Sequence, residues 1–236
     1  MSDPFASFSK LRGRIVDPEQ SRFRCLDYDA MDDAMRRAGL GDDWRRSHEA
    51  REATRVAALA RHGPGDLWVF AYGSLMWDPA IRFVEARPAS VTGFHRRFCI
   101  QSLMGRGSPE QPGLMAGLDA GGHCQGIAYR IAAAQVEHET RVLWSREMIT
   151  PTYLPTYAQT HTPGGLVSAI TFVVDRSQEK YRAALDDEQT ARMIARGEGV
   201  FGRNIDYLND LVRQMRALGI VDEPLFALHA LANRLR

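Results

Sequence analysis

Leu67-Trp-Val-Phe-Ala-Tyr72 is a run of aromatic and β-branched residues, and Gly73-Ser-Leu-Met-Trp77 follows it directly. Such a run predicts a buried β-strand that ends sharply at the Gly-Ser pair. Glycine has no side chain to block a ligand and tolerates positive φ, so the backbone can come close to a bound group here. Successive N–H groups in such a turn can bind an anion. On spacing alone, a hairpin corner with Ser74 as a turn residue is the more common explanation.

The rest of the chain mixes strands and helices. Further strands are predicted at residues 90–102, 113–119, 124–131, 152–160 and 166–175, with a loop at 120–123. Pro151 and Pro155 place the fourth of these at a sheet edge. Helices are predicted at residues 132–146, 178–196, 204–218 and 225–236. This order favours an α+β fold with a mainly antiparallel sheet or barrel over alternating βαβ units.

Residues 1–65 differ from the rest, since they are rich in Arg and Asp. Residues 42–62 have helical composition with a weak apolar stripe, and His62-Gly-Pro-Gly65 ends that helix. We therefore divide the chain into an N-terminal helical extension, 1–65, packed on a main domain, 66–236.

The composition is that of an ordinary soluble globular protein, with 44% hydrophobic residues, 25% charged residues and a net charge of +1. This balance favours neither nucleic acid nor an anionic membrane as a partner. Cys25, Cys99 and Cys124 form no close pair, which suits a reduced compartment. The chain start has no secretory h-region and residues 67–77 are too short to span a bilayer. We expect a cytoplasmic protein and, because no surplus apolar stripe is visible, a monomer.

Glu147 is a candidate general acid or base. Val136, Thr140, Leu143 and Glu147 fall on one helical face, so a carboxylate lies on the inward stripe. Burial and the helix C-terminus both disfavour its charge and raise its pKa toward neutrality. Two alternatives remain: Arg146 neutralises it structurally, or the helix ends earlier and Glu147 is solvated.

The other motifs give weaker evidence of function. Gly197-Glu-Gly-Val-Phe-Gly202 matches a dinucleotide fingerprint but follows a helix, so we expect a link between helices. Met76 stands where a Gly-x-Ser-x-Gly nucleophile elbow needs glycine. No His or Cys spacing favours zinc. We expect His95-Arg-Arg97 on a solvent-facing strand surface and Asn204 or Arg203 as a cap or structural anchor.

Taken in order, several segments resemble the ChaC-like γ-glutamylcyclotransferases, which act on glutathione. The first is Val69–Trp77, and the others are Gly93-Phe-His-Arg-Arg-Phe98, Gly126-Ile-Ala-Tyr-Arg130, Ser145-Arg-Glu-Met148 with Tyr153 behind it, and Gly202-Arg-Asn-Ile-Asp-Tyr-Leu208. The resemblance covers residues 67–232 and leaves the N-terminal extension outside. One departure is Ala71, where many members have a second glycine, so that a methyl group could tighten the loop.

The resemblance implies a small mixed-strand barrel flanked by helices and no cofactor, and the His and Cys spacing noted above favours no metal. It implies that glutathione is cleaved to 5-oxoproline and Cys-Gly by attack of its own α-amine on the γ-carbonyl. The catalytic glutamate of the family matches Glu147. The substrate-binding loop matches Val69, Phe70, Ala71, Tyr72, Gly73, Ser74 and Leu75.

The chemistry of the residues agrees with that transfer. The attacking amine needs a base and the departing nitrogen needs a proton, and one carboxylate with a raised pKa can do both. Two alternatives stay open: a cyclotransferase for other γ-glutamyl amines or dipeptides, and a non-catalytic regulatory protein linked to cation transport.

Overall fold

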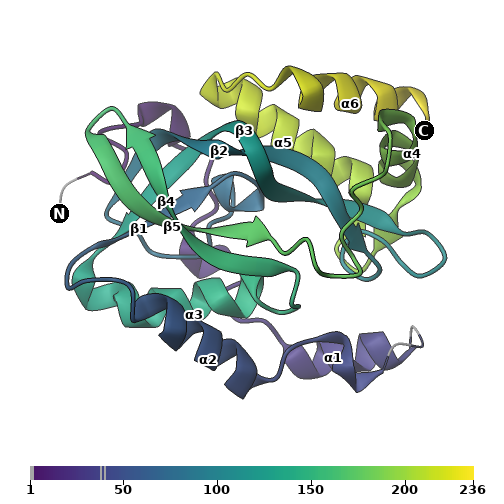
Figure 1. Cartoon of the computed structure of the whole chain (residues 1–236), viewed down its shortest axis with the longest axis horizontal. Helices are drawn as coiled ribbons and strands as arrows, with labels where there is room; N and C mark the ends of the chain where they lie inside the picture. The colour runs from purple at the N-terminus through teal and green to yellow at the C-terminus, as the bar shows by residue number, and fades with distance from the viewer. Residues whose placement is uncertain (1–2, 38, 40) are drawn as a thin grey trace.

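A closed barrel of five strands forms the centre of the computed structural model, which describes residues 3–37, 39 and 41–236 (Figure 1). The strands are β1 Leu67–Ala71, β2 Glu85–Ser102, β3 Gly113–Ile131, β4 Tyr153–Thr162 and β5 Gly165–Val174. Their order is β1-β3-β2-β4-β5. β3 pairs antiparallel with β1 and β2, while β1 and β5 pair in parallel and close the ring. The predicted α+β barrel is thereby confirmed.

The loop predicted at residues 120–123 is wrong, because residues 113–131 form the single strand β3. β3 stays paired with β2 through this region, from Thr92↔His123 to Phe94↔Ala120. The pairing shifts there, and Gly121 and Gly122 take positive φ values of 99° and 76°. The glycines therefore mark a bulge within a continuous hairpin, which a sequence pattern cannot distinguish from a turn.

The edge position predicted for residues 152–160 is partly correct. β4 pairs with β5 along its whole length but with β2 only at Thr160 and His161. Pro155 thus lies where β4 has no second neighbour, as its missing N–H requires.

The helix predicted at residues 178–196 is half as long in the structure, where α4 is Asp187–Arg196. Asp186 and Gln189 form a capping box that fixes the helix start. The residues before it run beside β2 instead: Tyr181 bridges to Ile100, and Arg182 N donates to Cys99 O at 2.8 Å.

The remaining helices agree more closely with the sequence pattern. They are α1 Tyr28–Arg37, α2 His48–Leu59, α3 Val136–Glu147, α5 Asn204–Leu218 and α6 Glu223–Arg234. In Figure 1, α4, α5 and α6 lie on one side of the barrel, and α1, α2 and α3 lie along the opposite side. α3 begins four residues later than predicted, after a 3-10 turn at Ala133–Gln135.

One large core joins both sides to the barrel. It includes Tyr129 of β3, Leu143 of α3 and Leu208 of α5, all fully buried. Phe8 and Leu11 belong to the same core, so the N-terminal extension packs directly on the barrel. The division at residues 65 and 66 stays a prediction.

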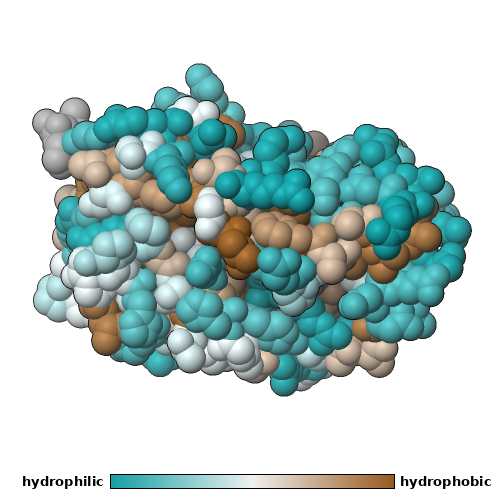
Figure 2. Space-filling view, turned by 90° about the horizontal axis from the view of Figure 1, so that it is seen from above, coloured by the Kyte–Doolittle hydropathy of each residue, from teal (hydrophilic) through white to brown (hydrophobic). Residues whose placement is uncertain are grey.

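One face of the molecule is mostly hydrophilic. Figure 2 shows this face, seen from above Figure 1, and on it hydrophilic residues surround smaller hydrophobic patches. Among the described residues, no helix has the length and apolar character needed to cross a membrane. Cellular compartment and oligomeric state stay predictions.

Candidate active site

A cavity of about 410 Å³ opens where β1 ends. Its walls come from the loop after β1, the C-terminal end of α3, the first turn of α5 and the loop after β2. The N-terminal extension supplies a further wall. Of the residues predicted from the sequence, the structure brings Tyr72, Gly73, Ser74, Leu75 and Glu147 together here.

The loop after β1 turns at once into a short 3-10 helix, Ser74–Met76. Met76 N donates to Gly73 O at 2.9 Å and Trp77 N donates to Ser74 O at 3.1 Å. The first N–H groups of such a helix have no partner within it, and no side chain caps these. Backbone donors at the cavity wall can bind an anion or an oxyanion.

Gly73 does not use positive φ, since its φ is −121° and its ψ is −136°. An added Cβ would lie 3.4 Å from the Tyr207 hydroxyl, an ordinary contact. Close approach of backbone to the cavity is therefore the feature that glycine supplies at this position.

The other three predicted loop residues lie deeper. Val69, Phe70 and Ala71 are fully buried in β1 and do not line the cavity. The methyl group of Ala71 packs in the large core, so the departure from a second glycine leaves the cavity unobstructed. These residues hold the strand that carries Tyr72 and the turn.

Glu147 is the last residue of α3 and lines the cavity with a side chain that is 15% exposed. Thr140 and Leu143, on the same helical face, are fully buried. Burial raises the pKa of Glu147 above its ordinary value, although the neighbouring Arg146 acts in the opposite direction. The carboxylate is thus both nearly buried and paired.

Arg146 connects Glu147 to the loop after β1. Its Nε lies 2.9 Å from Glu147 Oε1, its Nη2 donates to Ser74 Oγ at 2.6 Å, and its Nη1 donates to Asp78 O. The guanidinium also lies 4.2 Å from the ring centre of Phe23. From the sequence, Arg146 is only a possible neutraliser of Glu147, whereas in the structure it links the Glu147 carboxylate to the loop after β1.

Three tyrosines surround Glu147 in the cavity wall: Tyr72, Tyr153 and Tyr207. Burial, reinforced by nearby negative charge, raises the pKa of all three, that of Tyr207 to about 12. Tyr72 donates to Phe172 O at 2.7 Å and Tyr153 donates to Ala116 O at 3.1 Å. Among the described residues, none accepts a hydrogen bond from Tyr207, whose hydroxyl is therefore available to a ligand.

Arg96 was expected at solvent, and this expectation is wrong. Arg96 is buried and donates to Tyr72 O and Gln125 O, each at 2.6 Å, and to Asp222 at 2.7 Å. It thereby joins the end of β1 to β3 and to the start of α6. A cluster of basic residues in a predicted strand does not indicate that one of them binds buried carbonyl groups.

Asn204 is a structural anchor, which is one of the two roles predicted for it. Its side chain accepts from Leu114 N and donates to Leu114 O, both at 2.7 Å, in a fully buried position. Gly197–Gly202 does link two helices, α4 and α5, through a two-stranded turn. Among the described residues, no three His, Cys, Asp or Glu side chains gather as a metal site would require.

Comparison with known proteins places the chain in a family. A family model described as ChaC-like protein matches residues 67–235. A glutathione-specific γ-glutamylcyclotransferase of Escherichia coli (strain K12) is 41% identical over 181 residues, 76% of this chain and 78% of that protein. A mouse relative, glutathione-specific γ-glutamylcyclotransferase 1, is 32% identical over 66% of this chain and 74% of its own length.

The fold agrees with a solved structure as well. A crystal structure of a yeast γ-glutamyl cyclotransferase specific to glutathione has a TM-score of 0.68 and covers 73% of this chain and 97% of its own. At 22% identity this likeness concerns the fold alone. The family model spans the barrel and the later helices, including every loop and helix end that meets at Glu147, and the chain belongs to the ChaC-like protein family.

Proposed function

We propose that this chain is a γ-glutamylcyclotransferase that cleaves glutathione to 5-oxoproline and Cys-Gly. The observation that carries the proposal is Glu147, a nearly buried carboxylate with a raised pKa, facing the turn Tyr72–Leu75 across one cavity. The curated relatives named above act on glutathione, which supports this substrate.

The reaction closes a ring within the substrate. Glu147 accepts a proton from the α-ammonium group, and the freed amine attacks the γ-carbonyl carbon of the same glutamyl unit. The carbonyl oxygen becomes an oxyanion beside the N–H groups of Ser74 and Leu75. The bond to the cysteine nitrogen then breaks as Glu147 returns the proton to that nitrogen, and the ring nitrogen passes its second proton to the released amine of Cys-Gly. No water is consumed, and the products are 5-oxoproline and Cys-Gly.

Each role has a physical basis. A carboxylate whose pKa lies above its ordinary value is a better match for proton transfer near neutral pH than a solvated one. The substrate supplies its own nucleophile, so Ser74 acts as a turn residue held by Arg146. A cavity that keeps the γ-glutamyl chain folded adds the advantage of proximity. Val69, Phe70 and Ala71 contribute by holding the turn in place.

The test is product formation. The wild type is incubated with glutathione, and 5-oxoproline and Cys-Gly are measured by mass spectrometry beside Glu147→Gln and a control, Glu188→Gln. Glu188 is 60% exposed on α4, and its ion-pair partner among the described residues is Arg192. We expect the two products in equal amounts, a loss of at least about a hundredfold in Glu147→Gln, and wild-type rates in the control.

Each other result would favour one of the alternatives. Products from Glu147→Gln at the wild-type rate would keep the reaction and remove the residue from its role. Turnover only of other γ-glutamyl amines or dipeptides would change the substrate. No turnover of any γ-glutamyl compound would favour a non-catalytic regulatory protein.

A further inference from the structure

Part of the cavity wall lies outside the family match, which begins at residue 67. Val16, Arg22, Phe23 and Leu26 of the N-terminal extension all line the cavity. The family match does not account for these four residues, so their contribution to the cavity is specific to the part of this chain before residue 67.

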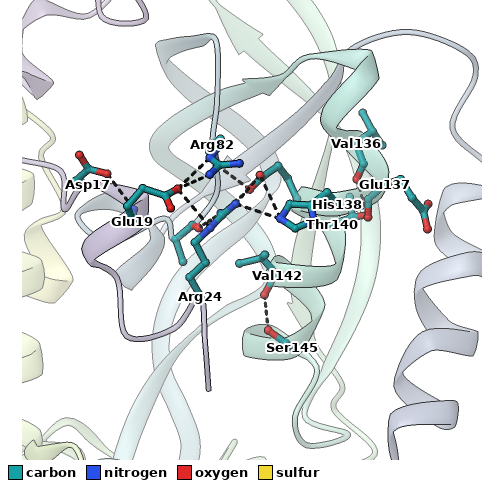
Figure 3. A network of polar contacts seen from close by, with 12 residues as sticks. Asp17, Glu19, Arg24, Arg82, Val136, Glu137, His138, Thr140, Val142 and Ser145 are labelled. Carbon is teal, nitrogen blue, oxygen red and sulfur yellow. Dashed lines mark hydrogen bonds and ion pairs between the residues drawn. The ribbon is translucent and has the colours of Figure 1, made fainter. Parts of the chain in front are cut away.

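The extension is fixed to the main domain next to the cavity. Val16 N donates to Trp77 O at 2.8 Å, directly after the turn that follows β1. Arg24 donates to both oxygens of Glu139 on α3, each at 2.8 Å. Figure 3 shows Arg24 pointing toward His138 of α3, with Glu19 reaching Arg82 beside it. Residues 16–26 are therefore held firmly enough to position side chains against a ligand.

Arg22 is an exposed residue whose guanidinium lies against two aromatic rings. Its guanidinium lies 4.7 Å from the ring centre of Phe201 and 5.1 Å from that of Phe23. No carboxylate among the described residues lies within ion-pair distance of it. Two aromatic faces orient the group while leaving its N–H donors free.

Arg106 brings a second cation to the same end of the cavity. Its guanidinium lies 5.7 Å from the ring centre of Tyr207 and donates to Arg203 O at 3.2 Å. In the part of the chain that the structure describes, no carboxylate lies within ion-pair distance of it. Burial lowers the pKa of Arg106 and the charge of Arg22 adds to this effect, while Tyr207, Asp210 and Asp206 act in the opposite direction. Such a pair favours an anionic ligand group.

Arg22 and Arg106 line the same cavity as Glu147 and Arg146, and the Phe23 ring contacts both Arg146 and Arg22. Asp210 also lines the cavity, but it is paired with Arg213. A γ-glutamyl peptide placed with its reacting carbonyl at Glu147 extends its leaving portion away from that carboxylate. The leaving portion of glutathione ends in a free carboxylate, which is complementary in charge to the guanidinium groups of Arg22 and Arg106.

We propose that Arg22 binds the terminal carboxylate of the departing peptide and selects substrates with a free C-terminus. This inference rests on the proposed function and adds a specificity determinant that lies outside the family match. The guanidinium presents planar donors to a carboxylate, with Arg106 adding charge from the loop after β2. The chemistry at Glu147 does not involve Arg22, so its removal acts on binding.

The experiment uses the full chain with two substrates, glutathione and its C-terminal amide, which lacks the terminal charge. For the wild type we expect kcat/KM to favour glutathione by about tenfold to a hundredfold, the usual worth of a charge-assisted hydrogen bond. In Arg22→Gln the KM for glutathione rises by a similar factor, while kcat and the rates with the amide stay near wild type. Arg22→Lys restores part of the preference.

Arg12→Gln is the matched control, because Arg12 lies in the same extension, pairs with Asp3 and does not line the cavity. It should keep the wild-type preference. Equal losses on both substrates in Arg22→Gln would mean a structural role and overturn the inference, as would an unchanged KM for glutathione. Turnover by the wild type keeps the proposed function in either case, whereas a wild type inactive on both substrates overturns the function and this inference together.

Discussion

Arg146 Nε lies 2.9 Å from Glu147 Oε1, so two neighbouring residues at the end of α3 form an ion pair inside the cavity. Burial raises the pKa of the carboxyl group and the guanidinium opposes that rise. The balance between them sets the pH at which Glu147 can act as a base. Structural neutralisation and catalysis are thus compatible roles for one carboxylate.

Replacing Arg146 should shift the pH profile. In Arg146→Gln the charge that lowers the Glu147 pKa is lost while burial remains, so the pKa rises further. The acidic limb of kcat/KM, which follows ionisation of the free enzyme's base, should move to higher pH by about one to three units. Arg141→Gln, on the same helix but 52% exposed, should leave the limb in place. An unmoved limb in Arg146→Gln would remove Glu147 as the titrating base.

Two of the cavity tyrosines should differ in effect: one substitution should weaken substrate binding and the other should lower stability. Tyr207→Phe removes a hydroxyl without a described acceptor, so the KM for glutathione should rise about tenfold with little change in stability. Tyr153→Phe removes the bond to Ala116 O and should cost about 1 kcal/mol of unfolding free energy instead. Steady-state kinetics and urea unfolding of both variants check this. The same KM change in both would contradict it.

The local pattern of apolar residues predicted the structure well where burial of neighbouring residues alone decided it. The run 67–72 contains β1, which ends one residue earlier at Ala71, and the spacing of Thr140, Leu143 and Glu147 predicted the correct buried face of α3. In both cases the periodicity of burial depends on neighbours close in sequence, and an apolar residue type records it directly.

Contacts distant in sequence were missed. Arg96 looks like a surface residue until its carbonyl partners at Tyr72 and Gln125 are known, and residues 178–186 looked helical until β2 offered them a partner. The cavity wall formed by residues 16–26 had no signal at all, since Arg22 and Phe23 follow no motif. Aromatic–cation contacts between segments almost 180 residues apart, such as Arg22 with Phe201, cannot be deduced from one sequence.

Asn204 should matter for stability more than its size suggests. Asn204→Ala leaves the N–H and C=O of Leu114 unpaired in a fully buried place, which should cost about 2–5 kcal/mol of unfolding free energy. Asn233→Ala, exposed on α6, should change it by less than about 0.5 kcal/mol. Urea denaturation measures both, and a loss under about 1 kcal/mol for Asn204→Ala would show that water or a shifted loop satisfies Leu114.

The pair Arg24–Glu139 should make stability depend on pH. Burial alone would raise the pKa of Glu139, but the hydrogen bonds from Arg24 and from Arg82 N hold it below its ordinary value. In the wild type this pair therefore stabilises the fold above the unfolded pKa of a glutamate, and the contribution is lost as pH falls through the lower folded value.

Removing Arg24 reverses the direction in which the pKa of Glu139 is shifted. In Arg24→Gln the fully buried Glu139 keeps its burial and loses its main partner, so its folded pKa rises above the unfolded value. At neutral pH the variant should lose about 3–5 kcal/mol of unfolding free energy, and the deficit relative to the wild type should shrink as pH falls and Glu139 takes up a proton. Arg82→Gln, whose side chain pairs with the exposed Glu19, should cost no more than about 1 kcal/mol. Urea unfolding of the three proteins between neutral and mildly acidic pH tests this. A deficit that stays constant over that range would mean that Glu139 is already protonated or that Arg24 acts only through packing.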